Sequence, residues 1–286
     1  MSGNPSRQIV RIDDVPYRDI DDVSLRLDII RPDPIPVEPM PVLIYLFGGR
    51  WMSGDRKQNR NELLPADTGL FTVSIDYRLS HQATFPAQIA DARAAVRWLR
   101  AHADDYHIDP ARIGVWGYSS GGHLAALLGT APDATALDDG AAANGYSSRV
   151  QAVLTLSAPT DFLQAGGYHE DADSPESRLV GGPIRERTEL ARQANPITYI
   201  RGDEPPFLII HGVQDEAVPV GQSQLLYDAL VRAGVDATFM SIAKAGHRWG
   251  TATPYGDLVN HIALAFFAKH LHPIREETPH GGIEQL

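Results

Sequence analysis

The sequence predicts an α/β fold, with a central, mostly parallel sheet and helices on both of its faces. Short apolar runs of strand length alternate along the chain with stretches whose apolar residues recur at helical spacing. The composition is that of an ordinary globular protein, with 43% hydrophobic and 21% charged residues. Since 286 residues are enough for one large α/β unit, we expect a single domain over residues 1–286.

The first two expected strands differ in pattern. Residues 25–29 alternate between apolar and charged side chains, as a half-buried strand does, whereas residues 42–47 are continuously apolar, as a strand covered on both faces is. Between them, prolines recur within residues 31–41; they block helix and remove ladder donors, so an extended loop is expected. The further expected strands are residues 70–75, 112–116, 150–156, 207–210 and 237–242.

Helices are expected between these strands. Residues 86–102 carry apolar side chains at helical spacing, and Pro86 suits a first helical turn. The other expected helices are residues 120–128, 187–194, 221–233 and 258–271. Residues 162–200 interrupt the alternation with polar, Gly- and Pro-containing sequence. We expect them to form a short cap insertion over the carboxyl edge of the sheet, where open α/β sheets place their sites; a domain boundary is the weaker alternative.

Composition and missing motifs exclude several function classes. A net charge of -11 with no basic run disfavours nucleic-acid binding. The absence of cysteine removes disulfides, thiolate nucleophiles and Cys-ligated metals. No zinc-protease, P-loop or dinucleotide motif is present, so no metal and no cofactor are expected. No apolar run approaches a membrane span, and the N-terminus lacks the pattern of a secretory signal, so we expect a cytoplasmic protein.

A candidate nucleophile lies directly after one predicted strand. Residues 117–121 read Gly-Tyr-Ser-Ser-Gly, which matches G-x-S-x-G. The motif follows the strand at 112–116 and opens a helix, as a nucleophile elbow requires, with glycines giving room at the sharp turn. The alternative interpretation is a plain Gly-rich turn in which Ser119 caps the helix. The context favours Ser119 as a nucleophile.

A base and an acid follow in the chain. A serine hydroxyl needs a base to take its proton, and that base needs a carboxylate to orient it. His247 lies in a Gly-flanked loop after the last predicted strand, and Asp215 lies just after the strand at 207–210. Alone, His247 reads as a surface histidine and Asp215 as a turn or N-cap residue. Together, and in this order, they predict a catalytic triad of Ser119, Asp215 and His247.

An oxyanion hole would complete this site. The backbone N–H of Ser120, directly after the nucleophile, is one expected donor. Further donors are expected from the Gly-rich loop at residues 47–51, which directly follows the strand at 42–47. Glycines there let the backbone approach a substrate closely.

With these motifs in place, the chain resembles the α/β-hydrolase superfamily. It is similar to the hormone-sensitive-lipase-like carboxylesterases, and especially to small bacterial members of acetyl- and feruloyl-esterase type. The matching segments run from about residue 25 to about 270 and include FGGRW at 47–51, SGD at 53–55, DYRLS at 76–80, IDPARIGVWGYSSGGHLAALLG at 108–129, PTDF at 159–162, PPFLIIHGVQDEAVP at 205–219 and AGH at 245–247. The resemblance implies an α/β-hydrolase fold with an eight-stranded sheet, and oxyanion donors at Gly49 and Arg50 beside Ser120.

The oxyanion loop departs from the family pattern H-G-G-G. Phe47 replaces the histidine and Arg50 replaces the last glycine. A backbone N–H is kept at Arg50, but a positive φ there would cost a non-glycine residue about 1 kcal/mol or more. The Arg50 side chain has two open roles. It binds a substrate carboxylate or phosphate, or it has no part in binding and either extends to solvent or pairs with a nearby acid such as Asp55.

Other residues are assigned more weakly. Trp51, Tyr118 and Phe162 are expected to line an acyl or alcohol pocket, or else to be packing residues. Asp76 and Arg78 read as an ion pair at a strand end, and Asp161 as a capping group. His123 and His211 read as core histidines with satisfied hydrogen bonds.

We therefore predict a serine hydrolase that cleaves small acyl or aryl carboxylic esters through an acyl-enzyme, with the N-terminal segment and the cap insertion covering the site. Its expected partner is a small-molecule ester. The alternatives are an arylformamidase-like amide hydrolase, a tailoring lyase or cyclase with an altered oxyanion loop, and a non-catalytic binding module. A homodimer through residues 237–271 is kept open beside a monomer.

Overall fold

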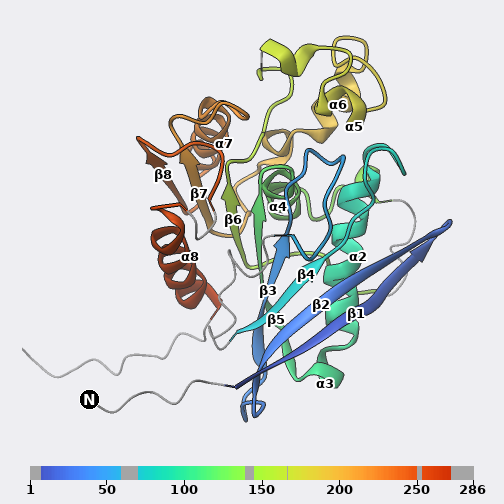
Figure 1. The fold of residues 1–286 in the computed structure, drawn as a ribbon, viewed down its shortest axis with the longest axis vertical. Helices are drawn as coiled ribbons and strands as arrows, with labels where there is room; N and C mark the ends of the chain where they lie inside the picture. The colour runs from blue at the N-terminus through green and yellow to red at the C-terminus, as the bar shows by residue number, and fades with distance from the viewer. Residues whose placement is uncertain (1–7, 59–69, 139–144, 166, 250–252, 272–286) are drawn as a thin grey trace, which may run out of the picture.

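The computed structural model describes residues 8–58, 70–138, 145–165, 167–249 and 253–271, and Figure 1 gives the labels of its elements. One eight-stranded sheet has the order β1-β2-β4-β3-β5-β6-β7-β8. Only β2 runs against the other strands, so the sheet is mostly parallel and the predicted fold class is confirmed. The strands are β1 (Gln8–Ile20), β2 (Val23–Asp33), β3 (Met40–Leu46), β4 (Phe71–Ile75), β5 (Ile108–Tyr118), β6 (Ala152–Leu156), β7 (Phe207–Gly212) and β8 (Ala237–Ile242).

The N-terminal segment is an edge strand, which the sequence did not predict. β1 pairs antiparallel with β2, and register shifts between Ile12 and Val15 and between Pro16 and Arg18 interrupt the ladder. Those irregularities hide the apolar alternation that would have marked a strand. We expected this segment to cover the site, but β1 contributes no residue to either of the hollows beside Ser119 described below. Residues 1–7, where the absence of a secretory signal was read, lie outside the described residues.

The proline-rich connection is shorter than predicted. β2 continues to Asp33 and β3 begins at Met40, so both strands enter the segment at 31–41 that was expected to be a loop. Pro32 is tolerated because it pairs with Ile9 of the edge strand β1, beyond the last residue of β2 that pairs with β4.

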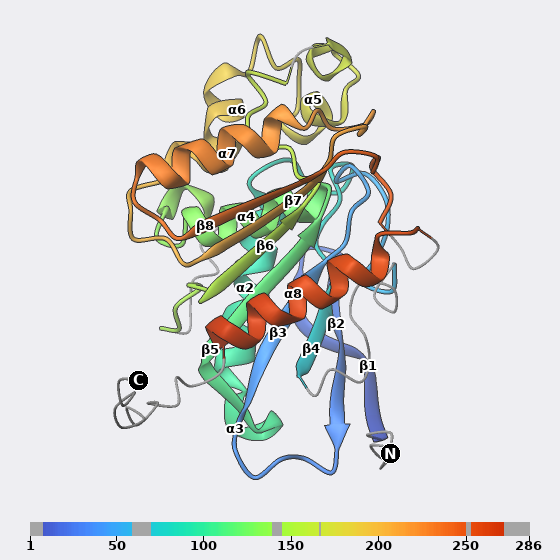
Figure 2. The ribbon, with the colours of Figure 1, turned by 90° about the vertical axis from the view of Figure 1, so that its left-hand side faces the viewer.

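Helices cover both faces of the sheet. α2 (Ala87–Ala101) and α4 (Ser120–Thr130) pack on one face, with α3 (Ala103–Tyr106) following α2, and α8 (Gly256–Leu271) crosses the other (Figure 2). α7 (Gly221–Arg232) packs on β7 and β8. The close approach of α8 depends on Gly114 of β5, because a Cβ there would lie 2.9 Å from Phe267 and Leu271. None of the helices in the described ranges is both long and apolar enough to cross a membrane.

Short helices follow β6 and lie beyond the carboxyl ends of the parallel strands (Figure 1). They are η2 (Gly167–Glu170), α5 (Pro175–Leu179), α6 (Thr188–Ala194) and η3 (Pro196–Tyr199). Ser174 caps α5 by accepting a hydrogen bond from the Ser177 N–H, and Pro175 occupies its first turn. These elements occupy the 162–200 segment and reach the edge of the sheet at which β5 ends.

The expected ion pair between Asp76 and Arg78 does not form. Arg78 Nε instead pairs with Asp91 of α2 at 2.9 Å, and Asp76 Oδ2 accepts a hydrogen bond from Arg56 at 2.6 Å. The reason is tertiary: α2 brings Asp91 against both the side chain and the backbone N–H of Arg78. Both ion pairs therefore join elements that are distant in sequence.

Candidate active site

The candidate nucleophile lies on a sharp turn between β5 and α4. Ser119 has φ 54° and ψ -119°, a strained conformation for a residue with a side chain. The turn requires the glycines around it. A Cβ at Gly117 would lie 2.1 Å from the Gly121 carbonyl oxygen, and one at Gly121 would lie 2.1 Å from the Leu46 carbonyl oxygen. The G-x-S-x-G pattern is thus a steric requirement for packing the start of α4 against β3.

The three residues predicted as a triad lie in one hydrogen-bonded chain. Ser119 Oγ is 3.1 Å from His247 Nε2, and His247 Nδ1 is 2.7 Å from Asp215 Oδ2. The Asp215 side chain has no exposed surface, whereas the His247 side chain is 22% exposed. The nitrogen that faces the carboxylate carries the proton, so Nε2 is left to accept a hydrogen bond from the serine hydroxyl.

Asp215 is held as a carboxylate. Its Oδ1 accepts hydrogen bonds from the backbone N–H groups of Ala217 and Val218, and its Oδ2 also lies 3.2 Å from His211 Nε2. Burial opposes ionisation, but the hydrogen bonds from His211 and His247 outweigh it and hold the pKa of Asp215 well below its ordinary value. The group that orients His247 therefore stays ionised across the physiological range.

The loop that carries His247 is fixed from two sides. Tyr118 donates its hydroxyl to the His247 carbonyl oxygen at 2.9 Å, and Trp249 Nε1 donates to Ser157 Oγ at 2.9 Å. Beside the loop, a Cβ at Gly212 would lie 2.4 Å from the Ala245 carbonyl oxygen. Contact between the end of β7 and this loop therefore brings Asp215 and His247 together.

The Gly-rich loop after β3 lies against the nucleophile turn. A Cβ at Gly48 would lie 3.1 Å from Ser119 Cβ. Gly49 has φ 136° and Arg50 has φ 60°, so the residue that departs from the family pattern adopts the left-handed conformation. Among the residues that the structure describes, none accepts a hydrogen bond from the backbone N–H groups of Gly49, Arg50 or Ser120. These donors are available to a bound oxyanion.

Arg50 is exposed and makes no ion pair with any residue in the described ranges. The expected pairing with Asp55 is absent: Asp55 Oδ1 accepts a hydrogen bond from the Lys57 backbone N–H instead. Arg50 lines both of the hollows that flank Ser119. The guanidinium is therefore open to a ligand.

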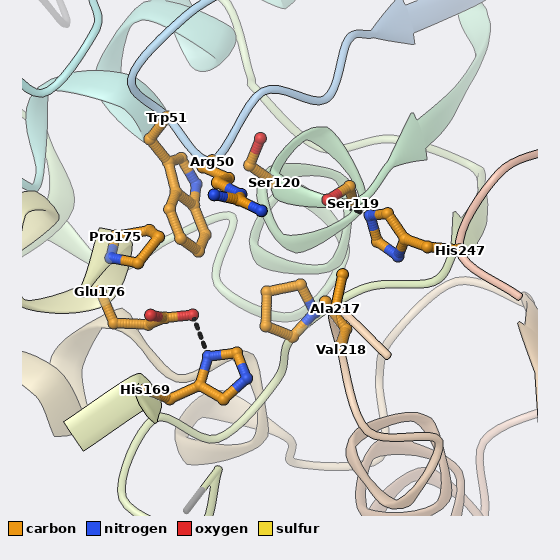
Figure 3. Close-up of a pocket in the computed structure, with 11 residues that line it drawn as sticks. Arg50, Trp51, Ser119, Ser120, His169, Pro175, Glu176, Ala217, Val218 and His247 are labelled. Carbon is orange, nitrogen blue, oxygen red and sulfur yellow. Dashed lines mark hydrogen bonds and ion pairs between the residues drawn. The ribbon is translucent and has the colours of Figure 1, made fainter. Parts of the chain in front are cut away.

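Two hollows meet at Ser119. The small cavity has a volume of about 60 Å³, and the wide groove one of about 610 Å³. The small cavity, shown in Figure 3, is lined by Arg50, Trp51, Ser119, Ser120, Pro159, His169, Pro175, Glu176, Ala217, Val218 and His247. The wide groove is lined by Gly49, Arg50, Gln58, Tyr118, Ser119, Gln214, Glu216, Ala217, Gly246, His247 and Arg248.

The residues predicted to bind substrate divide between these places. Trp51 lines the small cavity and Tyr118 lines the wide groove. Phe162 lines neither; it is fully buried behind Trp51, with ring centroids 5.5 Å apart, and stacks on His123. Phe162 is thus a packing residue that supports the cavity wall, the alternative that its apolar character left open.

Both core histidines are buried as predicted, but only His211 has both ring nitrogens paired, donating to the Val218 carbonyl oxygen and accepting from Ser223. His123 Nε2 donates to the Ala194 carbonyl oxygen at 2.7 Å, and its Nδ1 has no partner among the described residues. Asp161 accepts from the Leu163 N–H and from Asn195. Within the described ranges no group of three His, Asp or Glu side chains is arranged to hold a metal ion.

Among the lining residues of the small cavity that were not predicted, two are titratable. His169 and Glu176 line it from the segment around η2 and α5, and both are buried. A histidine and a glutamate in a polar segment match no motif, and only the packing of α5 over the strand ends brings them to Ser119. No signal in the single sequence would have selected them.

The chain is similar in sequence and in fold to known esterases. The BD-FAE family model matches residues 27–230. Esterase LipC of Mycobacterium tuberculosis is 31% identical over 274 residues, which cover 90% of this chain and only 65% of LipC, so the chain spans less than two thirds of that relative. A truncated carbohydrate esterase from gut microbiota is 29% identical with a TM-score of 0.79, covering 92% of this chain and 96% of that one. Esterase Est2 of Thermogutta terrifontis is 28% identical with a TM-score of 0.76, covering 95% and 96%.

Proposed function

This chain belongs to the BD-FAE family and has the α/β-hydrolase fold of its esterase relatives, and on that premise we propose that it hydrolyses carboxylic esters through an acyl-enzyme on Ser119. The observation that carries the proposal is the continuous hydrogen-bonded chain from Ser119 Oγ through His247 to Asp215. Ester hydrolysis suits this site, because side chains and backbone N–H groups supply every group that acyl transfer needs.

The steps follow from the positions of these atoms. Ser119 Oγ attacks the acyl carbon while His247 Nε2 takes its proton, and Asp215 stabilises the imidazolium. The C–O bond to the alcohol then breaks, and His247 gives its proton to the leaving oxygen. Water attacks the acyl-enzyme while His247 takes its proton, and that proton returns to Ser119 Oγ when the acid departs. Serine and histidine are restored after each cycle.

The oxyanion that forms in both steps is assigned to the backbone N–H groups of Gly49, Arg50 and Ser120. These N–H groups are preorganised donors, because none of them has to be released from another acceptor among the described residues first. Arginine therefore replaces glycine without loss of the N–H on which the hole depends. The small size of the cavity beside Ser119 fits short acyl groups.

The proposal is tested with p-nitrophenyl acetate and butyrate. Wild type should release a burst of p-nitrophenol equal to the enzyme concentration, followed by steady turnover, because the acyl-enzyme accumulates. Ser119→Ala should lose the burst and at least about 10³-fold in kcat. Intact mass spectrometry should show the acyl adduct on wild type only. Ser24→Ala, at an exposed serine of β2, is the matched control and should behave as wild type.

Three outcomes count against the proposal. Equal rates in Ser119→Ala and wild type would place the chemistry elsewhere. Faster hydrolysis of N-formylkynurenine than of any aryl ester would favour an amide hydrolase. A folded wild type that turns over no ester would favour the lyase, cyclase or binding alternatives.

A further inference from the structure

The small cavity contains a buried carboxylate that the proposed reaction does not use. Glu176 is only 3% exposed, and its Oε1 accepts a hydrogen bond from His169 Nδ1 at 2.9 Å (Figure 3). Its other oxygen, Oε2, has no hydrogen-bond partner among the residues that the structure describes. A carboxylate has about four acceptor positions, and burying one with so few donors is costly.

A second polar atom in the same cavity is also unsatisfied. Trp51 is 1% exposed, and its indole N–H finds no acceptor in the described part of the chain. The wall also contains apolar residues, which are Pro159, Pro175, Ala217 and Val218, and further polar ones such as Arg50 and His169. A pocket in which fixed polar atoms lie among apolar side chains is the usual form of a specific small-molecule subsite. Here the unpaired groups are the Glu176 acceptor, the Trp51 donor and the Ser120 hydroxyl, so a ligand hydroxyl pairs with Glu176 Oε2 and an alkyl group does not.

The size and the lining of the hollows decide which part of the ester enters each. His247, whose Nε2 must meet the leaving oxygen, lines both hollows, but its neighbours Gly246 and Arg248 line only the wide groove, which has about 610 Å³ for the alcohol. The acyl part stays on Ser119 and takes the small cavity. A volume of about 60 Å³ exceeds several times the roughly 10–15 Å³ that one water needs, which fits a few heavy atoms.

We propose that the small cavity is an acyl subsite for short hydroxyl-bearing acyl groups, and that Glu176 determines this specificity by accepting a hydrogen bond from the acyl hydroxyl. The proposal rests on the proposed esterase function and names its substrate class. His169 acts as a positioning residue, because its hydrogen bond to Oε1 fixes the carboxylate and leaves Oε2 for the substrate. An unsubstituted acyl chain would leave Oε2 without a donor.

The test compares p-nitrophenyl butyrate with the two enantiomers of p-nitrophenyl 3-hydroxybutyrate. Wild type should prefer one hydroxyacyl enantiomer over butyrate by at least about tenfold in kcat/KM, since hydrogen bonds to a charged group are among the stronger ones. Glu176→Gln keeps the size of the side chain and an oxygen for His169 but removes the charge, so the preference should fall several-fold. In Glu176→Met, the ratio of kcat/KM for the 3-hydroxybutyrate and butyrate esters should be close to the ratio of their uncatalysed rates. Comparing this ratio between variants cancels the intrinsic reactivity of each ester.

The controls separate the possible failures. Glu186→Gln changes an exposed glutamate between α5 and α6 and should keep the wild-type ratio. If the ratio of kcat/KM for the 3-hydroxybutyrate and butyrate esters is equal in wild type, Glu176→Gln and Glu176→Met, the specificity role is overturned. The esterase proposal still stands in that case, provided that butyrate is hydrolysed. No hydrolysis of butyrate by wild type would overturn the esterase proposal itself.

A hydroxyl on the alcohol part is the other source of the same chemistry. 1-Glyceryl monobutyrate and propyl butyrate differ only in hydroxyls on the alcohol, so they report on that part alone. Their rate ratio should be unchanged by Glu176→Gln. A ratio that changes here, and not in the acyl series, would place the alcohol in the small cavity and refute the assignment. If Glu176→Met does not fold, the Glu176→Gln ratios decide the matter.

Discussion

Replacing Asp215 with asparagine tests how the triad is oriented. Oδ1 accepts two backbone hydrogen bonds, from Ala217 at 2.9 Å and Val218 at 2.8 Å. The asparagine oxygen must stay there, because an NH₂ group cannot accept them. Its NH₂ then replaces Oδ2 and faces His247 Nδ1, 2.7 Å away in the wild type. His247 must accept at Nδ1 and carry its proton on Nε2.

In that tautomer His247 cannot take the proton of Ser119. His211 gives no relief, because its Nε2 donates to the Val218 carbonyl oxygen and would face the new NH₂ group as a second donor. The same change in another serine triad costs about 10⁴-fold in kcat, which equals about 5 kcal/mol of transition-state stabilisation. We expect a loss of that order for Asp215→Asn.

The assay is kcat for p-nitrophenyl acetate between pH 7 and 9, with circular dichroism to confirm folding. Asp228→Asn, on the exposed face of α7 where the Asp228 carboxylate accepts a hydrogen bond from Gln224, is the matched control and should retain wild-type activity. Asp215→Asn activity within tenfold of wild type, in a folded protein, would refute this account of His247.

Three further predictions concern stability, each measured by urea unfolding. Gly121→Ala should cost about 3 kcal/mol or more, because its Cβ would lie 2.1 Å from the Leu46 carbonyl oxygen; a change under 1 kcal/mol would contradict this packing. Asp91→Asn should cost about 3–5 kcal/mol, since it removes the buried partner of Arg78, and a loss no larger than that of an exposed Asp→Asn change would argue against it. Burial, opposed by the hydrogen bond to the Ala194 carbonyl, lowers the pKa of His123 to about 4. The unfolded chain therefore binds this proton first as pH falls. The free energy of unfolding should fall by about 3 kcal/mol between pH 6.5 and 4 in wild type but not in His123→Gln. Parallel losses in both proteins would contradict this account of His123.

Some elements were predictable because their signals are local. The continuous apolar run at 42–47 corresponds to β3 (Met40–Leu46), and the spacing of apolar residues at 86–102 to α2 (Ala87–Ala101). β1 was missed because its register shifts break the alternation on which strand prediction depends. The pairing of Arg78 with Asp91 was missed because nothing in the sequence says where α2 will lie against the end of β4.

The fold class and the candidates for the chemistry follow from the amino-acid sequence alone. Alternating strand and helix patterns specify a mostly parallel sheet, and such a sheet brings residues that follow its strands to one edge. Ser119, Asp215 and His247 were therefore expected to lie close together. Their local motifs carry this information because a sharp turn and a proton relay each require particular residue types at particular places.

The shape of the space around Ser119 depends on how segments distant in sequence pack together. This packing placed Phe162 behind the wall, left Arg50 free of an ion pair within the described ranges, and brought His169 and Glu176 into the small cavity. Specificity depends on which side chains converge from segments distant in sequence, and convergence is set by packing of α5 and the loops over the strand ends. A local sequence pattern does not specify that packing.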